Sequence, residues 1–268
     1  MSGDSEALLL EFATEIARDA GAILRSRFGQ PHEIRFKGTI DLVTEADQAA
    51  EALIATRIRE AYPAHDLLGE EGSRGAGGES PFCWVIDPLD GTTNFAHGLP
   101  TFAVSIALEE EGSPIVGVVY DPMRDEIFAA RRGGGATLNG TPLRVSETSE
   151  LIRSLLVTGF SYDLSVRAVQ ANAWRTFLTQ VQAIRQTGSS AINLAYIAAG
   201  RLDGYWEWGT LPWDVAAGAL LVTEAGGRIT TMDGQPFQSS VRETLASNGN
   251  LHPAMLGTLA ESLDDLPR

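Results

Sequence analysis

Residues 82–95 read Phe-Cys-Trp-Val-Ile-Asp-Pro-Leu-Asp-Gly-Thr-Thr-Asn-Phe, an apolar strand that runs directly into a polar turn. Asp87 follows the predicted strand 82–86 at once, so it lies at the carboxyl end of a strand, where layered α/β folds place ligands. Pro88 is rigid, and Asp87 and Asp90 can therefore face one point across a tight turn. Two carboxylates that converge without a basic partner are typical of a site for a hard cation.

The residues after the turn add a second kind of ligand. Gly91, Thr92 and Thr93 offer backbone N–H groups where a helix can begin, and such groups bind anions, phosphate above all. Cation ligands beside an anion-binding turn are the parts of a metal-assisted phosphatase. The alternative is an ordinary Asp-Gly turn in which Asp90 only caps the next helix. We favour the phosphatase because the whole string follows an apolar strand.

Composition narrows the possible partners. The chain has 268 residues and carries 35 Asp and Glu against 20 Lys and Arg, a formal net charge of −15. Such acidity gives no general attraction for nucleic acid or an anionic membrane, so we expect neither as a direct partner. A single cysteine, Cys83, excludes an internal disulfide framework. The first residues carry no positive charge and no apolar run approaches ~20 residues, so we expect a cytoplasmic protein without a membrane span.

The rest of the chain predicts a layered fold. The middle is β-rich, and after about residue 149 strands and helices alternate, which indicates α/β layers. The predicted helices span 5–28, 44–61, 165–182, 190–199, 213–225 and 253–263. The predicted strands span 33–36, 82–86, 102–108, 115–120, 126–130, 155–158, 183–186, 204–208, 228–231 and 244–246, with 143–145 as an edge strand. We expect the chain to divide into an α+β half, 1–147, and an α/β half, 148–268. We expect the two halves to pack tightly as one unit.

Several other chemistries lack their motifs. The glycines at 133–140 are not followed by the lysine of a P-loop, and no Gly-x-Gly-x-x-Gly follows a strand. No Gly-x-Ser-x-Gly elbow occurs. The four histidines have no zinc-binding spacing. The absence of a nucleophile motif fits metal-assisted hydrolysis, which needs no covalent enzyme intermediate.

Several segments of the chain resemble those of a known family. The segment 87–94 is similar to the first signature of the inositol monophosphatase family, and Leu-Pro-Trp-Asp-Val-Ala-Ala-Gly at 211–218 is similar to its second. Segments 41–47, 69–71 and 188–190 also match, in the family's order. The resemblance implies an α/β fold, the five-layered αβαβα sandwich of the sugar phosphatases. It further implies a magnesium-dependent, lithium-sensitive phosphatase, with myo-inositol 1-phosphate as the first candidate substrate.

The resemblance also implies metal ligands. Glu70, Asp87 and the carbonyl of Leu89 would hold a first Mg²⁺. Asp87, Asp90 and Asp214 would hold a second, with Asp87 bridging the two ions. A third, weaker Mg²⁺ would contact Glu70 mainly through water. The family's active form further suggests two or three Mg²⁺ per site and a homodimer.

Roles at the phosphate and the alcohol follow from the same resemblance. Thr92 and Asp47 would orient the attacking water, and the N–H groups of Gly91 and Thr92 would hold phosphate oxygens. The alcohol side of a phosphorylated polyol would contact Gly188, Ser189, Ser190, Glu207 and Asp214. Lys37 matches a loop lysine. The α+β half would thus carry most metal ligands, and the α/β half would carry Asp214 and the alcohol pocket.

Each of these residues has a structural alternative. Asp47 lies three residues after Thr44, as in a capping box, and in that reading only caps its helix. The alternatives for the others are a solvated acidic loop at 70–71, a helix N-terminal charge at Asp214, the polar face of a strand at Glu207 and simple N-caps at Ser189 and Ser190. The tryptophans at 206, 208 and 213 are interpreted as packing rather than as a sugar platform.

Two departures from the family pattern leave the substrate open. Gly98 stands where a basic residue is common, and Ser190 where many inositol enzymes have a smaller one. Related folds cleave fructose 1,6-bisphosphate, 3′-phosphoadenosine 5′-phosphate or histidinol phosphate, and these remain alternative substrates. A hypothesis of another class is a regulatory partner of the transcription machinery, because some bacterial relatives have that role. The acidic charge permits a protein partner with a basic surface.

Overall fold

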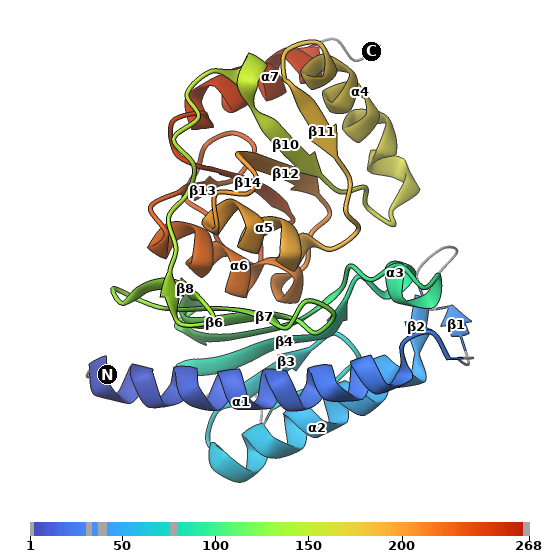
Figure 1. Cartoon of the computed structure of the whole chain (residues 1–268), viewed down its shortest axis with the longest axis vertical. Helices are drawn as coiled ribbons and strands as arrows, with labels where there is room; N and C mark the ends of the chain where they lie inside the picture. The colour runs from blue at the N-terminus through green and yellow to red at the C-terminus, as the bar shows by residue number, and fades with distance from the viewer. Residues whose placement is uncertain (1–2, 31–33, 37–41, 76–79, 265–268) are drawn as a thin grey trace.

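The protein, seen here as a computed structural model, is built of alternating helical and sheet layers (Figure 1). The structure describes residues 3–30, 34–36, 42–75 and 80–264. From bottom to top in Figure 1, α1 and α2 cover a seven-stranded sheet, α5 and α6 form a middle layer, and a five-stranded sheet is covered by α4 and α7. This order confirms the predicted αβαβα sandwich.

The first helical layer is amphipathic. α1 (Gly3–Arg27) and α2 (Glu45–Ala61) each turn one apolar stripe toward the sheet and pack against each other. The stripe follows the period of 3.6 residues that the sequence shows. Its buried members are Leu9, Ala13, Ile16, Ala20 and Leu24 on α1, and Ala46, Ala50, Ile54 and Ile58 on α2.

The seven-stranded sheet carries the β-rich middle of the chain. Its order is β3-β4-β5-β6-β7-β8-β9, with β3 parallel to β4 and the remaining neighbours antiparallel. The strands are β3 (Asp66–Gly69), β4 (Phe82–Asp90), β5 (Ala103–Glu110), β6 (Ser113–Asp121), β7 (Glu126–Arg131), β8 (Gly135–Leu138) and β9 (Thr141–Pro142). A separate antiparallel pair joins β1 (Ile34–Phe36) and β2 (Leu42–Thr44).

The middle helices are buried on nearly every side. α5 (Ser190–Ala198) and α6 (Pro212–Glu224) are sandwiched between the sheets and are accordingly rich in Ala and Leu. A Cβ atom at Gly117 of β6 would lie 2.8 Å from the carbonyl oxygen of Ala217, so the glycine permits α6 to approach the sheet closely.

The second sheet has the order β11-β10-β12-β14-β13. Its strands are β10 (Leu155–Thr158), β11 (Ala183–Arg185), β12 (Gly204–Trp208), β13 (Arg228–Thr230) and β14 (Glu243–Ser247). The outer helices α4 (Arg167–Leu178) and α7 (His252–Asp264) bury Phe177, Met255 and Leu259 with Trp206 of the sheet. The division of the chain near residue 147 stays a prediction.

Several predicted boundaries were wrong. The predicted helix 165–182 is shorter, because a 3₁₀ turn (Leu164–Val166) precedes α4 and residues 179–182 form a turn before β11. The predicted edge strand 143–145 is not a strand, and the edge is β9 instead. β2, β3 and β8 were missed because three or four residues give too short a pattern. The described residues include no helix long and apolar enough to cross a membrane.

Candidate active site

The motif that opened the sequence analysis lies at the carboxyl end of β4. The predicted strand ended at residue 86, but β4 continues to Asp90 through an irregularity in its pairing with β5. Asp87 pairs with Ser105 and Asp90 with Ala103, so β4 advances three residues where β5 advances two. Pro88, which has no N–H to give to a neighbouring strand, lies inside this bulge.

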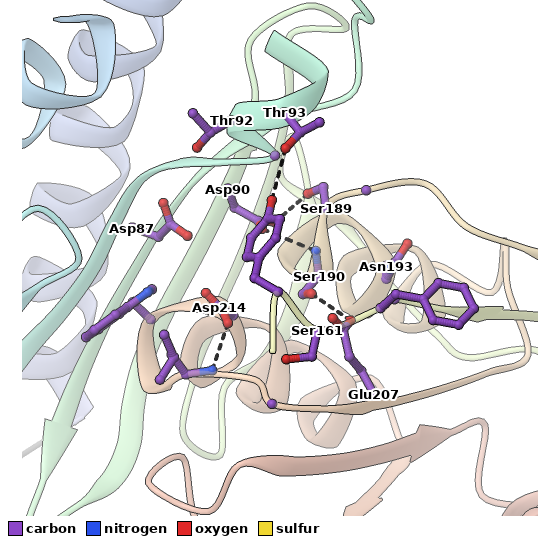
Figure 2. Close-up of a pocket in the computed structure, with 18 of the residues that line it drawn as sticks. Asp87, Asp90, Thr92, Thr93, Ser161, Ser189, Ser190, Asn193, Glu207 and Asp214 are labelled. Carbon is purple, nitrogen blue, oxygen red and sulfur yellow. Dashed lines mark hydrogen bonds between the residues drawn. The ribbon is translucent and has the colours of Figure 1, made fainter. Parts of the chain in front are cut away.

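A pocket of about 640 Å³ opens above this bulge, between the two sheets. Figure 2 shows Asp87, Asp90 and Asp214 on one side of it and Glu207 on another. Its wall includes every residue that the sequence assigned to metal, phosphate and alcohol, but not Asp47, which was assigned to the attacking water. The lining members are Glu70, Asp87, Leu89, Asp90, Gly91, Thr92, Gly188, Ser189, Ser190, Glu207 and Asp214. Lys37 lies outside the described residues. The structure therefore brings together segments spread over more than half of the chain.

Asp90 is held by the start of α5. Ser189 Oγ donates a hydrogen bond to Asp90 Oδ2, and the backbone N–H of Ala191 donates to the same oxygen at 2.7 Å. Ser189 also caps α5, since its hydroxyl accepts from the N–H of Ile192 at 3.2 Å. Ser189 is thus both the predicted N-cap and the predicted site residue. Its hydroxyl accepts a hydrogen bond as the cap and donates one to Asp90.

Asp214 enters from the first turn of α6. Its Oδ2 accepts the N–H of Leu211 at 2.7 Å, which satisfies one of the donors that begin a helix. The backbone beside it is tied to the first sheet, because Ser105 Oγ donates to the carbonyl of Trp213 at 3.0 Å. Since Ser105 pairs with Asp87, this hydrogen bond links the strand that carries one carboxylate to the helix that carries another.

Burial and neighbouring charges raise the pKa of Asp87, Asp90 and Asp214. Burial raises the pKa of Asp87 well above its usual range, and the charges of Glu70, Asp90 and Asp214 raise it further. Burial and the charges of Asp90 and Glu70 do the same to Asp214. Burial raises the pKa of Asp90 to about 6, opposed by the hydrogen bonds from α5. Such a cluster of like charges is the arrangement that a multivalent cation relieves.

The carboxylate oxygens are engaged by the protein. Asp87 Oδ1 accepts the N–H of Leu89 at 2.9 Å, and oxygens of Asp90 and Asp214 accept the N–H groups described above. Within the ranges that the structure describes, no three His, Cys, Asp or Glu side chains stand arranged as ligands of one ion. The ligand assignments therefore stay predictions.

Asp47 and Thr92 meet beside this cluster. Thr92 Oγ1 is 3.1 Å from Asp47 Oδ1 and 3.0 Å from the carbonyl of Leu89, so its one proton can be donated to either. Asp47 Oδ2 accepts the N–H of Thr44 at 2.9 Å, which is the capping box predicted from sequence. Burial raises the pKa of Asp47 to about 6, against the hydrogen bonds from Thr44.

Glu207 lies on β12 at the opposite wall. Its Oε2 accepts hydrogen bonds from Tyr205 Oη at 2.6 Å and from Ser190 Oγ at 3.0 Å. Burial raises the pKa of Glu207 to about 7, although both hydrogen bonds lower it. This carboxyl is therefore poised between its two protonation states near neutral pH, and Ser190 occupies part of its accepting capacity.

Two glycines let the phosphate-side loops approach each other. Gly91 has φ of 102°, and a Cβ atom there would lie 3.2 Å from the carbonyl oxygen of Gly188. Gly188 has φ of 85°, and its Cβ would lie 2.7 Å from the amide nitrogen of Asn94. That amide donates to the carbonyls of Thr101 and Thr187, at 2.7 Å each. Asn94 therefore joins α3 (Thr92–Ala96) to the segment that leads into α5, a role that the sequence analysis missed.

One wall of the pocket was not predicted from the sequence. Residues 159–163 follow β10 and line the pocket, and Tyr162 Oη lies 3.1 Å from Thr93 Oγ1. The signal that could have found them is their place after the carboxyl end of a strand. Further lining residues that were not predicted are Arg167, Gln186, Asn193 and Arg242. Trp206 and Trp208 are core residues as predicted, and Trp213 packs against the core as predicted while also lining the pocket.

The chain is similar in sequence and in fold to known proteins of one family. The chain matches the model of the inositol monophosphatase family over residues 6–267. It is 48% identical to a Synechocystis protein named inositol-1-monophosphatase, over 94% of this chain and 88% of the relative. It is 44% identical to a Salmonella typhimurium protein named Nus factor SuhB, over 96% of this chain and 97% of the relative. The solved inositol monophosphatase of Anabaena superposes with a TM-score of 0.87 at 42% identity, covering 95% of this chain and 96% of that one.

The family model spans nearly the whole chain, and the signature segments converge on one pocket in the fold that they predicted. The chain belongs to the inositol monophosphatase family.

Proposed function

We propose that this protein hydrolyses the phosphomonoester of a small polyol, with myo-inositol 1-phosphate as the first candidate. The observation that carries the proposal is the meeting of Glu70, Asp87, Asp90 and Asp214 in one pocket beside the first turn of α3. Relatives named inositol monophosphatase support the substrate class.

The donor set fits Mg²⁺. All the proposed ligand atoms are oxygens, the type that this hard cation prefers, and the mutual repulsion of the carboxylates would be relieved by it. We assign Glu70, Asp87 and the carbonyl of Leu89 to one ion, and Asp87, Asp90 and Asp214 to a second. A third, weaker ion would contact Glu70 mainly through water, giving two or three per site. When bound, these ions polarise the phosphate and activate water.

The phosphate would be held by backbone donors. The amides of Gly91 and Thr92 begin α3, and N–H groups in the first turn of a helix have no partner within that helix. They lie at the pocket wall next to Asp90. These donors would fix the phosphate oxygens, and the neighbouring carboxylates would hold the ions that polarise the phosphate.

Asp47 and Thr92 would orient the attacking water. With its proton donated toward Asp47, the Thr92 oxygen keeps its lone pairs and can accept a hydrogen bond from a water in the pocket. The Asp47 carboxyl, with a pKa of about 6, is a suitable final acceptor of the Thr92 hydroxyl proton near neutral pH. The capping bond from Thr44 fixes the carboxylate for this task.

The alcohol would lie between α5 and β12. Gly188, Ser189, Ser190, Glu207 and Asp214 line that side, and Glu207 would accept hydroxyl hydrogen bonds. Fructose 1,6-bisphosphate, 3′-phosphoadenosine 5′-phosphate and histidinol phosphate remain alternative substrates for the same chemistry. We further propose lithium sensitivity and a homodimer, on the resemblance to the family, and a cytoplasmic location, because the single cysteine suits a reducing compartment.

Phosphate release from a panel of phosphomonoesters, with and without Mg²⁺, tests the proposal. We expect metal-dependent release with inositol 1-phosphate among the preferred substrates. Release from none of the panel in the presence of Mg²⁺ would overturn it.

A second candidate function is a regulatory role with the transcription machinery. It is favoured by the relative named Nus factor SuhB, of which this chain matches 97%. The net charge of −15 suits a basic protein surface rather than nucleic acid. A pull-down with purified transcription complexes at two salt concentrations should show salt-sensitive binding, and no binding at either concentration would exclude this role.

A further inference from the structure

Glu51 is a buried carboxylate that the proposed chemistry does not use. It lies on α2 one turn after Asp47, so both side chains leave the same face of that helix. Its exposed fraction is 3%, although glutamate is rarely buried without partners. A buried carboxylate must be compensated by hydrogen bonds, and those of Glu51 lead to the loop that carries Glu70.

Both oxygens of Glu51 accept from the backbone of that loop. The N–H of Glu71 donates to Oε2 at 2.7 Å, and the N–H of Ser73 donates to Oε1 at 2.8 Å. A Cβ atom at Gly69 would lie 2.7 Å from Oε2, so the carboxylate also packs against the backbone just before Glu70. Glu70 is therefore flanked on both sides by residues whose backbone touches Glu51.

Further contacts close the loop on itself and tie it to β4. The N–H of Gly69 donates to the carbonyl of Ser73 at 2.9 Å, and an Arg74 guanidinium nitrogen donates to the carbonyl of Gly69 at 2.6 Å. The N–H of Glu70 donates to the carbonyl of Ile86 at 3.2 Å, which ties the loop to β4 next to Asp87. Two side chains of α2 reach the loop: Glu51 holds the N–H groups on either side of position 72, and Arg59 donates to the carbonyl of Arg74 at 3.3 Å, farther along the chain from Glu70.

We propose that Glu51 is a positioning residue for the metal site: it fixes the backbone around Glu70 and so aims that carboxylate at the ion. This inference rests on the proposed function, because it takes Glu70 as a metal ligand. Partners that hold a ligand in place set metal affinity, and their loss weakens it roughly 10–100-fold. The helix α2 then positions two groups: Glu70, through Glu51, and Asp47, which it carries itself.

The geometry requires a full-length carboxylate. Two N–H donors need two acceptors, and a glutamine offers one oxygen and an amide group that cannot accept. An aspartate keeps the charge and both acceptors but is one methylene shorter, so it cannot reach both N–H groups of the loop. Glu51→Gln and Glu51→Asp therefore separate the loss of charge from the loss of position.

The test is Mn²⁺ binding without substrate, followed by electron paramagnetic resonance, because Mn²⁺ shares the oxygen ligands of Mg²⁺. We expect the dissociation constant to rise about tenfold or more in Glu51→Gln and several-fold in Glu51→Asp, with kcat at saturating Mg²⁺ much less affected. Glu109→Gln is the matched control, since Glu109 is also buried and accepts a hydrogen bond, from Ser239 at 2.6 Å, but does not line the pocket. Thermal unfolding of each variant shows that it is folded.

The outcomes separate the inference from the proposed function. Affinity within twofold of wild type in a folded Glu51→Gln protein would overturn the role of Glu51. Wild-type affinity in Glu51→Asp with loss in Glu51→Gln would assign the effect to charge and overturn positioning. Glu70→Gln serves as the second arm: if it leaves Mn²⁺ binding unchanged, the assignment of Glu70 as a ligand fails, whatever Glu51 does.

Discussion

The hydroxyl of Thr92 lies 3.1 Å from Oδ1 of Asp47, a residue 45 positions earlier in the chain. The other oxygen of Asp47 accepts the N–H of Thr44 and completes the capping box of α2. Capping and a place in the site are therefore not alternatives for this residue, because each uses one carboxylate oxygen. The cap fixes the side chain, and the fixed side chain orients Thr92.

Replacing Asp47 separates these two uses. Asp47→Asn puts an amide where a proton acceptor stands, and we expect kcat to fall about a hundredfold or more, the usual range for loss of a general base. Thr44→Ala is the control, because it weakens the cap at a cost of about 1 kcal/mol but keeps the Thr92 contact. Steady-state kinetics and thermal unfolding measure the two effects. Equal kcat losses in both variants would argue against a role in orienting water.

Asp90 tests the metal. Asp90→Asn removes a charge that we assign to the second ion, and kcat should fall at least about a hundredfold, since an ion supplies several kcal/mol to the transition state. Wild-type activity should vanish with chelator and return with Mg²⁺ in a phosphate-release assay. Circular dichroism should show that α5 still forms despite the weakened contact with Ala191. Full wild-type activity in excess chelator would exclude metal-dependent hydrolysis.

Glu207 tests recognition of the alcohol. Glu207→Gln should raise KM or lower kcat for inositol 1-phosphate more than for a simple aryl phosphate, because only the polyol has hydroxyls that lose a partner. The comparison of kcat/KM for the two substrates in one variant cancels general damage to the site. Tyr205→Phe removes one donor to the same carboxylate and should shift the two substrates in the same unequal way. Equal losses on both substrates would remove Glu207 from the recognition of the alcohol.

Lithium tests the order of events at the second metal site. Li⁺ is similar in size to Mg²⁺ with half its charge, and it could replace the ion at Asp87, Asp90 and Asp214 while phosphate is still bound. Inhibition should then be uncompetitive with substrate at millimolar-scale Li⁺, a scale that the family resemblance implies, and should weaken as Mg²⁺ rises. Initial rates over a grid of substrate and Li⁺ measure this. Competitive inhibition, or none, would contradict the assignment of the second site.

His252, which does not line the pocket, should make the stability of the protein depend on pH. The ring is buried, with Nε2 2.9 Å from Thr230 Oγ1 and Nδ1 3.0 Å from Ser247 Oγ. Burial, and to a lesser extent the charge of Arg228, lowers its pKa from 6.5 to about 4. Between these values the unfolded chain binds a proton that the folded protein does not, so stability falls as the pH falls from 6.5 to 4. The loss amounts to about 3 kcal/mol at 1.36 kcal/mol per pKa unit.

The measurement is the free energy of unfolding in urea across this pH range, for wild type and His252→Asn. The carboxylates of the pocket titrate in both proteins, so the difference between the two curves isolates the histidine. We expect that difference to shrink as the pH falls from 6.5 to 4 and to be constant above 7. A difference that does not depend on pH would show that His252 is not held neutral.

Much of this protein was determined by local sequence. The apolar stripe of α1 and the alternation after residue 149 predicted helices and strands, because each depends on the period of nearby side chains. The string at 87–95, with four further segments in the family's order, predicted the family, which the comparisons confirm. Short strands such as β3 (Asp66–Gly69) escaped, since four residues have no period of their own and pair only because a neighbour is present.

The tertiary structure alone decided which side chains meet. Asp90 is held by α5 across 101 positions, and Ser105 reaches the carbonyl of Trp213 across 108. Glu51 looks in sequence like one more charge on a helix, and only the packing of α2 against β4 shows that it supports the loop of Glu70. The physical reason is that a pattern of apolar residues fixes which face of an element is buried. The partner of a polar side chain depends on which other element is buried against that face.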